Sequence, residues 1–520
     1  MDIRFHTMSK GAVRLDAVLL PTVQGVPILS SSRCSKFIPW LNESQSLADH
    51  SGELGEVTVC YGPASSLVPR VVLVGLGAGL GMPVDDFHKA VASGMRKCRA
   101  LKLARVGVML EDVFSATEII GKAPARVLEE LVFAALVSMY SCTEYRSAEV
   151  RIKGKKEKAA DFFEPDALVV LHSGKSVSSS LRLPVKLAEI AAAGVCFARS
   201  MVSSPANIMT PSRMVEEAVA LAKRHGFSCR ILHKAEMAKF GMGALLAVGE
   251  GSHKDSRFIV LEHNPRGVKK KAPLVLVGKG ITFDTGGISL KPAAGMHLMK
   301  GDMAGAAAVL GTFEAIGRLP ESFSCPVIGL IPCVENMPGG NATRPGDVVT
   351  TMSGKTVEIL NTDAEGRLIL CDALTYAQKN WKPLAVVDIA TLTGACSVAL
   401  GKGSAGVFTD NTGLRDAIME LGRMGGDRFW PMPLWEHMRE GLKSSVADIA
   451  NVGPREGGAI SAAIFLKSFV ENGTVWAHID MAGAGITEQD SPLCPKGGTG
   501  FGVRTLVGLA RSVSEKMLRG

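Results

Sequence analysis

The sequence predicts an α/β protein of two domains, a smaller N-terminal α/β domain and a larger C-terminal α/β/α domain with a central mixed sheet. A chain of 520 residues is too long for one hydrophobic core. Short apolar segments of strand length alternate with helical patterns, as expected when helices cover a sheet. The composition is that of an ordinary globular protein, with 47% hydrophobic residues, 21% charged residues and 57 glycines.

The N-terminal part alternates strands and helices, which favours a largely parallel sheet. We expect strands at residues 17–20, 70–74, 104–110 and 167–171, and helices at 85–100 and 125–140. The glycine-rich run VGLGAGLG at 74–81 lies between a strand and a helix, as a dinucleotide-binding loop would. Leu80 stands where that motif requires glycine, so a tight turn is the better interpretation.

A change of composition marks the end of the first domain. Residues 173–180 (SGKSVSSS) are polar and serine-rich, which is typical of a linker, and a long helix follows near 184–200. We therefore predict an N-terminal domain at 1–175, a linker helix at 176–200 and a C-terminal domain at 201–520.

The C-terminal domain begins with a helix whose start and end are both predicted by the sequence. Thr210 suits the N-cap, Pro211 the first helical position and Gly226 the far end. The expected strands are continuous apolar runs, which implies a sheet covered on both faces. We place strands at 257–262, 274–277, 326–331, 385–389 and 475–479, and helices at 303–316, 366–378 and 460–470.

Bulk properties argue against several classes of protein. No apolar run approaches the roughly 18–20 residues that span a bilayer, and the N-terminus lacks the apolar core of a secretory signal. The 11 cysteines form no CxxC pair, which disfavours a disulfide scaffold and a zinc finger. The net charge is +8. The chain has two basic clusters, at 153–158 and 266–271, which lack interleaved aromatic residues and are typical of solvated loops. We expect a cytoplasmic protein without a membrane partner.

The first group of chemical residues follows a predicted strand, in the segment VGKGITFDTGGISLK at 277–291. Lys279, Asp284 and Lys291 lie where the strand ends, and ligands of α/β sheets bind outside the carboxyl ends of strands. Glycines within the segment would let backbone approach a ligand closely. Asp302 lies at the start of the next helix, where an ordinary N-cap is the alternative interpretation.

The second group is NTDAEGRL at 361–368, directly after another strand-like run. Asp363 and Glu365 are two residues apart, so their carboxylates converge if the turn is extended. Each charge alone could belong to a turn or a cap. Together with Asp284 and Asp302 they make four carboxylates, which suit two divalent ions about 3.5–4 Å apart, as in two-metal hydrolases.

Other hydrolytic chemistries lack their motifs. None of the 11 histidines lies in either group except His297, which forms no HExxH-like pair and is expected to be a surface or structural residue. No GxSxG elbow is present, which disfavours a serine hydrolase.

The two groups resemble the signature segments of the leucyl (cytosol) aminopeptidase family, of which NTDAEGRL is the hallmark octapeptide. The resemblance covers roughly residues 190–510. It extends to MKGDMAGAA at 299–307, PANIMT at 205–210, ENMPGGNATRPG at 335–346, ATLTGA at 390–395 and WAHIDMAG at 476–483.

This resemblance implies a role for each matching residue. The ligands of two metal ions, zinc or manganese, would be Lys279, Asp284, Asp302, Asp363 and Glu365. Lys291 and Arg367 would be catalytic, with bicarbonate held by Arg367 as a proton shuttle. Met299, Thr391 and Gly394 would line the pocket for the first side chain of a peptide, leucine-like residues being preferred. The family also implies a homo-hexamer.

The chemistry agrees with this reading. Two metals activate a water and polarise the peptide carbonyl, Lys291 can donate to the developing oxyanion, and Arg367 is always protonated and so cannot be the base. A free substrate amine bound to one metal would explain cleavage at N-termini. Two alternatives are a nucleic-acid-binding protein with a secondary or vestigial peptidase site, favoured only by the positive charge, and a metal-dependent phosphoesterase.

Overall fold

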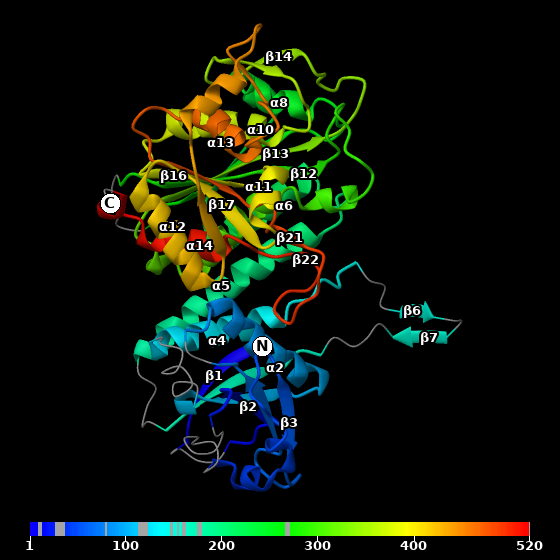
Figure 1. Ribbon diagram of the computed structural model, residues 1–520, viewed down its shortest axis with the longest axis vertical. Coiled ribbons are helices and arrows are strands. Elements are labelled where there is room, and N and C mark those ends of the chain that lie inside the picture. Colours follow the sequence, from blue (N-terminus) through cyan, green and yellow to red (C-terminus); the bar gives the residue numbers. More distant parts are fainter. Residues whose placement is uncertain are drawn as a thin grey trace. The chain divides into compact units, whose positions relative to one another are not determined.

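The structure is a computed structural model. It describes residues 1–8, 13–26, 37–78, 81–112, 123–145, 149–152, 155–158, 163–173, 179–265 and 271–518. The chain divides into two compact units, one of Met1–Ala192 with Gln489–Pro495, the other of Ala193–Glu488 with Lys496–Gly520. Each unit consists of a sheet and helices (Figure 1), so the predicted α/β fold class is confirmed.

The first unit contains a six-stranded sheet in the order β1-β8-β5-β2-β4-β3. All neighbours in this order are parallel except β3 and β4, as the strand–helix alternation predicts. Its strands are β1 (Asp2–Thr7), β2 (Ala17–Thr22), β3 (Val57–Tyr61), β4 (Arg70–Gly75), β5 (Arg105–Met109) and β8 (Ala167–His172). A separate hairpin joins β6 (Glu149–Ile152) to β7 (Lys155–Lys158).

Different segments pack on the two faces of this sheet. Helix α2 (Val84–Ala100) packs so closely on one face that a Cβ at Gly94 would lie 2.5 Å from the side chains of Leu19 and Val74. The opposite face packs against the segment that carries the short helices η2 (Pro39–Glu43) and η3 (Gln45–Leu47). Helix α4 (Pro124–Ser138) packs on α2.

Helix α5 (Ser179–Ser203) begins before the predicted position 184 and contains Pro184. Parts of four predicted features lie outside the described residues. They are Gly79 and Leu80 of the glycine-rich turn, 153–154 and 266–270 of the basic clusters, and 174–178 of the linker.

The second unit is built on a nine-stranded mixed sheet in the order β18-β17-β20-β16-β11-β13-β10-β9, with β12 also paired to β13. The strands β20, β16, β11 and β13 run parallel, whereas β10 is antiparallel to both of its neighbours. The bounds are β9 (Ser228–Leu232), β10 (Arg257–His263), β11 (Leu274–Gly278), β12 (Gly280–Asp284), β13 (Val327–Asn336), β16 (Ala385–Ala390), β17 (Ser404–Phe408), β18 (Arg428–Met432) and β20 (Trp476–Asp480).

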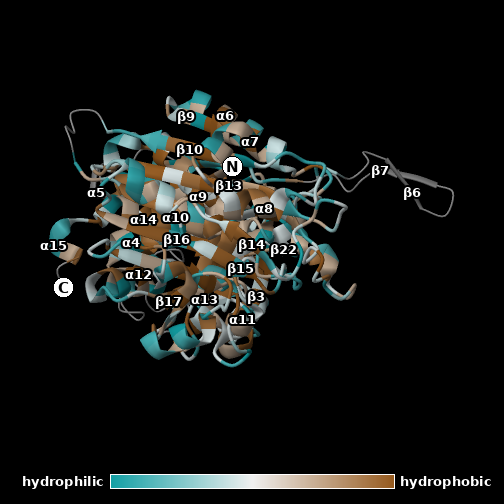
Figure 2. Ribbon diagram, turned by 90° about the horizontal axis from the view of Figure 1, so that it is seen from above, coloured by the Kyte–Doolittle hydropathy of each residue, from teal (hydrophilic) through white to brown (hydrophobic). Residues whose placement is uncertain are grey.

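Helices cover both faces of this sheet, as its continuous apolar strands predict. Alternate residues of β13 show the two sides: Ile328 and Leu330 belong to the core shared with α8, α10 and α13, whereas Gly329 faces Phe313 of α9. In Figure 2 the central strands β13 and β16 are brown, the colour of hydrophobic residues. The helices are α6 (Pro211–His225), α7 (Lys234–Lys239), α8 (Gly243–Gly249), α9 (Ala304–Arg318), α10 (Gly366–Asn380), α11 (Gly394–Leu400), α12 (Thr412–Gly425), α13 (Gly458–Lys467), α14 (Val503–Ser512) and α15 (Glu515–Leu518).

Smaller elements complete this unit. β14 (Asp347–Thr350), β15 (Thr356–Ile359) and β19 (Ile449–Ala450) form a three-stranded sheet, and β21 (Ile486–Thr487) pairs with β22 (Gly497–Gly498). Three short helices are η4 (Met296–Gly301), η5 (Pro320–Ser322) and η6 (Glu436–Leu442).

The predicted ends of α6 are present. Thr210 accepts a hydrogen bond from the Arg213 amide, and Gly226 adopts the left-handed conformation with φ 74°. The edge strands β1, β3, β9 and β18 escaped prediction because they mix exposed and buried residues and lack the continuous apolar run of a strand buried on both faces.

Among the described residues, no helix is both long and apolar enough to cross a membrane. The ten cysteines in this part of the chain are all free thiols.

Candidate active site

Lys279 lies at the break between β11 and β12, where the strand leaves β16 and continues beside β13. Its amide donates to the Ile389 carbonyl, and its carbonyl accepts from Ala306 at the start of α9. The glycines on both sides permit this close approach, since a Cβ at Gly278 or Gly280 would lie 2.6 or 2.5 Å from a neighbouring carbonyl oxygen. These two glycines therefore allow the chain to pack closely on itself.

The side chain of Lys279 lies among carboxylates. Its Nζ is 2.9 Å from both carboxylate oxygens of Asp302, 2.9 Å from Glu365 Oε1, and 2.8 Å from the Thr391 carbonyl, to which it donates. Burial opposes the charge of this ammonium, but Asp302, Glu365 and Asp284 outweigh that effect and raise its pKa. Segments far apart in sequence thus meet on one amino group.

Asp302 is not the helix cap that its position allows. The N-cap of α9 is Met303, which makes no side-chain capping bond. The Asp302 carboxylate accepts instead from Lys279 and from the Thr391 hydroxyl, the latter at 2.8 Å. The ordinary N-cap interpretation is therefore wrong, and the carboxylate belongs to the site.

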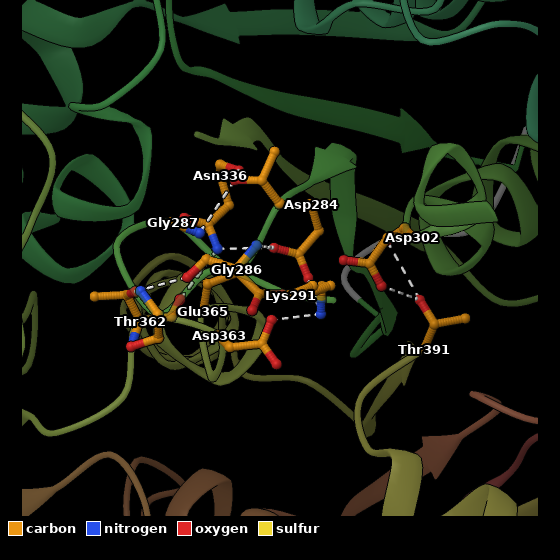
Figure 3. Close-up of polar contacts among 12 residues, drawn as sticks. Asp284, Gly286, Gly287, Lys291, Asp302, Asn336, Thr362, Asp363, Glu365 and Thr391 are labelled. Atoms are coloured by element: carbon orange, nitrogen blue, oxygen red, sulfur yellow. Dashed lines mark hydrogen bonds and ion pairs between the residues drawn. The ribbon is translucent and has the colours of Figure 1, made fainter. Parts of the chain in front are cut away.

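Lys291 holds a second pair of carboxylates. Its Nζ lies 2.7 Å from Asp284 Oδ2 and also contacts Asp363 Oδ1, as Figure 3 shows. Burial disfavours its charge, but Asp284 and Glu365 raise its pKa above the usual range. Asp363 and Glu365 are two residues apart, yet they pair with different lysines, because Glu365 is already in helical conformation at the start of α10.

Three of the four carboxylates are arranged as a cation site would require. Asp284, Asp302 and Glu365 are buried, and each offers an oxygen within 4.8 Å of the others. Burial and the Glu365 carboxylate raise the pKa of Asp284, and burial above all raises the pKa of Asp302, although lysines oppose both shifts. Two ammonium groups do not compensate four carboxylates, so the cluster fits divalent cations.

Arg367 lies in the first turn of α10 and is almost completely buried. Its Nη1 donates to the Asn451 carbonyl at 2.7 Å, and its Nε has no hydrogen-bond partner among the described residues. Burial lowers its pKa to about 10, which still leaves the guanidinium protonated at neutral pH. A buried cation with an unused N–H group suits an anion.

The predicted pocket residues come from three positions in the second unit. Thr391 follows β16 and contacts both Lys279 and Asp302. Gly394 opens α11 and is exposed, with no atom within 4 Å of the place of a Cβ. Met299 lies on η4 and is half-buried. His297, on the same helix, is exposed and belongs to no group of metal-ligating side chains among the described residues.

Two further residues support the site and received no role in the sequence analysis. Asp480, at the end of β20, accepts from the amides of Leu392 and Thr393 and from the Thr393 hydroxyl, and so holds the loop that begins with Thr391. Asn336, at the end of β13, donates to Asp284. Both are polar residues at the carboxyl end of a buried strand, the same signal that singled out Asp284.

A small cavity of about 10 Å³ borders Asn336, Thr362 and Gly287. None of the residues lining it is charged, so it is not the place of the chemistry.

Comparison with known families decides the identity of the chain. Residues 196–507 match the catalytic domain of the cytosol aminopeptidase family, and residues 35–149 match its N-terminal domain. The chain belongs to the cytosol aminopeptidase family. It is therefore a metal-dependent aminopeptidase, and the nucleic-acid-binding alternative finds no support.

Relatives and solved structures of this family match nearly the whole chain. A probable cytosol aminopeptidase of Nitratidesulfovibrio vulgaris is 49% identical over 97% of this chain and 98% of its own length, and one of Oleidesulfovibrio alaskensis is 46% identical over 98% of each. A mutant of tomato leucine aminopeptidase has a TM-score of 0.83 at 31% identity, covering 98% of this chain and 96% of its own. The bottromycin maturation enzyme BotP in complex with Mn has a TM-score of 0.81 at 32% identity, covering 96% and 99%.

Proposed function

We propose that the protein removes N-terminal amino acids, preferably leucine-like ones, from peptides with a free amino terminus. Two divalent ions, manganese or zinc, would be held by Lys279, Asp284, Asp302, Asp363 and Glu365. The observation that carries this proposal is the convergence of three buried carboxylates with only two lysines to balance four negative charges. One solved structure similar to this chain is that of BotP in complex with Mn.

When bound, the ions would supply a nucleophilic water at neutral pH and polarise the peptide carbonyl. Lys291 would act differently from Lys279 in the same reaction. Asp284 and Glu365 keep Lys291 protonated, and an ammonium gives the strong, charge-assisted donation that a developing oxyanion needs. Lys279 would serve as a ligand only as a neutral amine, so cation binding has to release its proton.

Arg367 would hold bicarbonate. It cannot be the base because it stays protonated, but its unpartnered Nε and its burial suit an anion that accepts the proton in its place. Met299, Thr391 and Gly394 would line the pocket for the first side chain. The open space at Gly394 leaves room for that side chain.

Three wider features belong to the same proposal. By family resemblance the protein would be a homo-hexamer, which size-exclusion chromatography with light scattering tests. The names of its relatives place them in the cytosol, and we propose the same location here. The domain limits of 1–175, 176–200 and 201–520 stay a prediction, which limited proteolysis tests.

The test of the function is a substrate panel on the metal-free protein. We expect hydrolysis of leucyl p-nitroanilide after reconstitution with Mn²⁺, Zn²⁺ or Co²⁺, little hydrolysis of aspartyl p-nitroanilide, and none of N-acetyl-leucyl p-nitroanilide, which lacks the free amine. Full activity in a verified metal-free sample contradicts the two-metal proposal. Hydrolysis of p-nitrophenyl phosphate in preference to the anilides would favour the phosphoesterase alternative.

A further inference from the structure

Asn336 is the last residue of β13 and the direct neighbour of Asp284 across the parallel pair β12–β13. It is buried, with 4% of its surface exposed. The register between these two strands therefore brings an uncharged amide next to a carboxylate of the proposed metal centre.

Both N–H groups of the Asn336 amide are used within this centre. Nδ2 donates to Asp284 Oδ1 at 2.8 Å and to the Thr362 carbonyl at 3.0 Å, immediately before Asp363. Both partners are pure acceptors, so only the NH₂ group of the amide, and not its oxygen, can face them. One side chain thus joins the two loops that carry Asp284 and Asp363 (Figure 3).

Asn336 engages only one of the two carboxylate oxygens of Asp284. Oδ1 accepts from Asn336 and also from the Gly286 amide at 2.9 Å. Oδ2 faces Lys291. A carboxylate whose one oxygen is held by two N–H donors presents the other oxygen to a cation in a fixed direction.

Asn336 is itself held in place. Its backbone carbonyl accepts from the amide and the hydroxyl of Thr285, both at 2.9 Å. Gly287 leaves little space on the other side, since a Cβ there would lie 2.8 Å from Asn336 Oδ1. The amide therefore has little freedom to turn away from Asp284.

We propose that Asn336 is a positioning residue of the metal centre. It ties Oδ1 of Asp284 to the loop of Asp363 and leaves Oδ2 as the oxygen that would bind a cation. Asn336 contacts neither Lys279, Asp302 nor Glu365 in the hydrogen bonds of its side chain, so it acts on the cation position next to Asp363 more than on the other. This inference depends on the proposed two-metal function.

The test measures Mn²⁺ binding to the full chain. Metal-free wild type, Asn336→Ala and the milder Asn336→Ser are titrated with Mn²⁺ by calorimetry and by electron paramagnetic resonance. We expect two ions in the wild type. In Asn336→Ala we expect one position unchanged and the other weakened about 10–100-fold, the usual effect of losing an outer partner of a ligand. Asn336→Ser should weaken the same position, and it replaces Asn336→Ala in the test if that variant does not fold.

A matched control separates positioning from a loss of stability. Asn411 is the N-cap of α12, where its side chain accepts from the Leu414 amide and donates to the Leu518 carbonyl. Asn411→Ala should lower the melting temperature and leave both Mn²⁺ affinities unchanged.

Excess Mn²⁺ should restore kcat in Asn336→Ala with little change in KM.

The outcomes distinguish the inference from the function on which it depends. Wild-type protein that binds fewer than two ions contradicts the two-metal function itself. If the wild type binds two ions and both Asn336 variants keep both affinities, Asn336 positions nothing. Equal weakening of both positions in step with a lowered melting temperature shows a merely structural role and also overturns the inference.

Discussion

At the scale of single residues, the site is organised by two ammonium groups that divide four carboxylates between them. Lys279 contacts Asp302 and Glu365, whereas Lys291 contacts Asp284 and Asp363. Lys279 is almost fully buried, while the side chain of Lys291 keeps 20% of its surface exposed. This difference in exposure is in keeping with the different roles proposed for the two lysines.

The first prediction separates the two lysines by alanine substitution. Lys279→Ala removes a proposed ligand, so it should weaken metal binding at one position, and excess metal should partly restore turnover. Lys291→Ala frees Asp284 and Asp363 from an ammonium and should leave both metals bound. It should lower kcat by about 10²–10³-fold, the usual loss for one oxyanion donor, and added metal should not restore it.

Turnover measured during metal titration of both variants checks this prediction. Lys402→Ala, which removes an exposed lysine paired with Glu488, serves as a control with unchanged activity. Recovery of Lys291→Ala by metal without recovery of Lys279→Ala would reverse the proposed roles.

At the scale of elements, the loop after β12 shows how glycines shape the site. Gly286 and Gly287 have φ values of +88° and +66°, a region that other residues rarely adopt. A Cβ at Gly286 would lie 2.4 Å from the Ser289 carbonyl oxygen and 2.9 Å from Asp363 Oδ1. The Gly286 amide also donates to Asp284, so the loop must turn sharply here to bring its carboxylate to the site.

The second prediction compares two glycines of similar conformation. Gly286→Ala should weaken metal binding and lower turnover at least tenfold, because the methyl group displaces Ser289 or Asp363. Gly226→Ala is the matched control, since φ there is +74° with nothing within 4 Å of the added Cβ. It should cost about 1 kcal/mol of stability from backbone strain alone and leave turnover unchanged. Calorimetric Mn²⁺ titration and melting curves of both variants check it; equal behaviour would contradict the role given to Gly286.

Helix α10 supplies another element-scale constraint through Asp372. This buried carboxyl accepts from the Leu245 amide at 2.9 Å and the Met352 amide at 2.7 Å, and so joins α10 to α8 and to the segment after β14. Burial raises its pKa to about 7, although the amide donors oppose the shift.

The third prediction follows from this raised pKa. The folded state binds the Asp372 proton up to about pH 7, whereas the unfolded chain releases it near pH 4. Folding is therefore favoured by acidification across this window, and the contribution is lost as pH rises from about 4 to 7, with a slope of at most about 1.4 kcal/mol per pH unit. Asp372→Asn removes this titration. The unfolding free energies of wild type and variant are measured from pH 5 to 8. The wild type should lose stability relative to the variant as pH rises; a constant difference would contradict the prediction.

At the scale of the whole molecule, the order of strands decides which residues meet. The parallel strands β11, β13, β16 and β20 end on the same edge of the sheet, and their ends carry Lys279, Asn336, Thr391 and Asp480. The site is thus assembled across the sheet of the second unit, and its negative charge is a cost to folding that bound cations would relieve.

The fourth prediction is that metal stabilises the folded protein. A cation that binds only the native state adds about 2.7 kcal/mol at a concentration of 100 times its Kd. Mn²⁺ should therefore raise the melting temperature of the metal-free protein, and a chelator should reverse the rise. Glu365→Gln should show a smaller rise, because one buried carboxylate charge is gone. Scanning calorimetry checks this; a melting temperature independent of metal would contradict a structural coupling between the site and the fold.

The sequence by itself determined the fold class, most buried elements and the family. Buried strands, the caps of α6 and the polar residues that follow strands are local patterns, and such patterns depend on neighbours in the chain. NTDAEGRL and the segment at 277–291 indicated the family before any geometry was known, and the family match confirms it.

Only the tertiary structure decided which charged side chains of the site contact each other. The contact of Lys279 with Asp302 spans 23 residues and that with Thr391 spans 112, and no spacing rule links such positions. They meet because β11 lies between β13 and β16, an order that depends on how apolar faces pack and not on distance along the chain. For the same reason Asn336 and Asp480 gained their roles only in the fold, where each ends a strand beside a loop of the site.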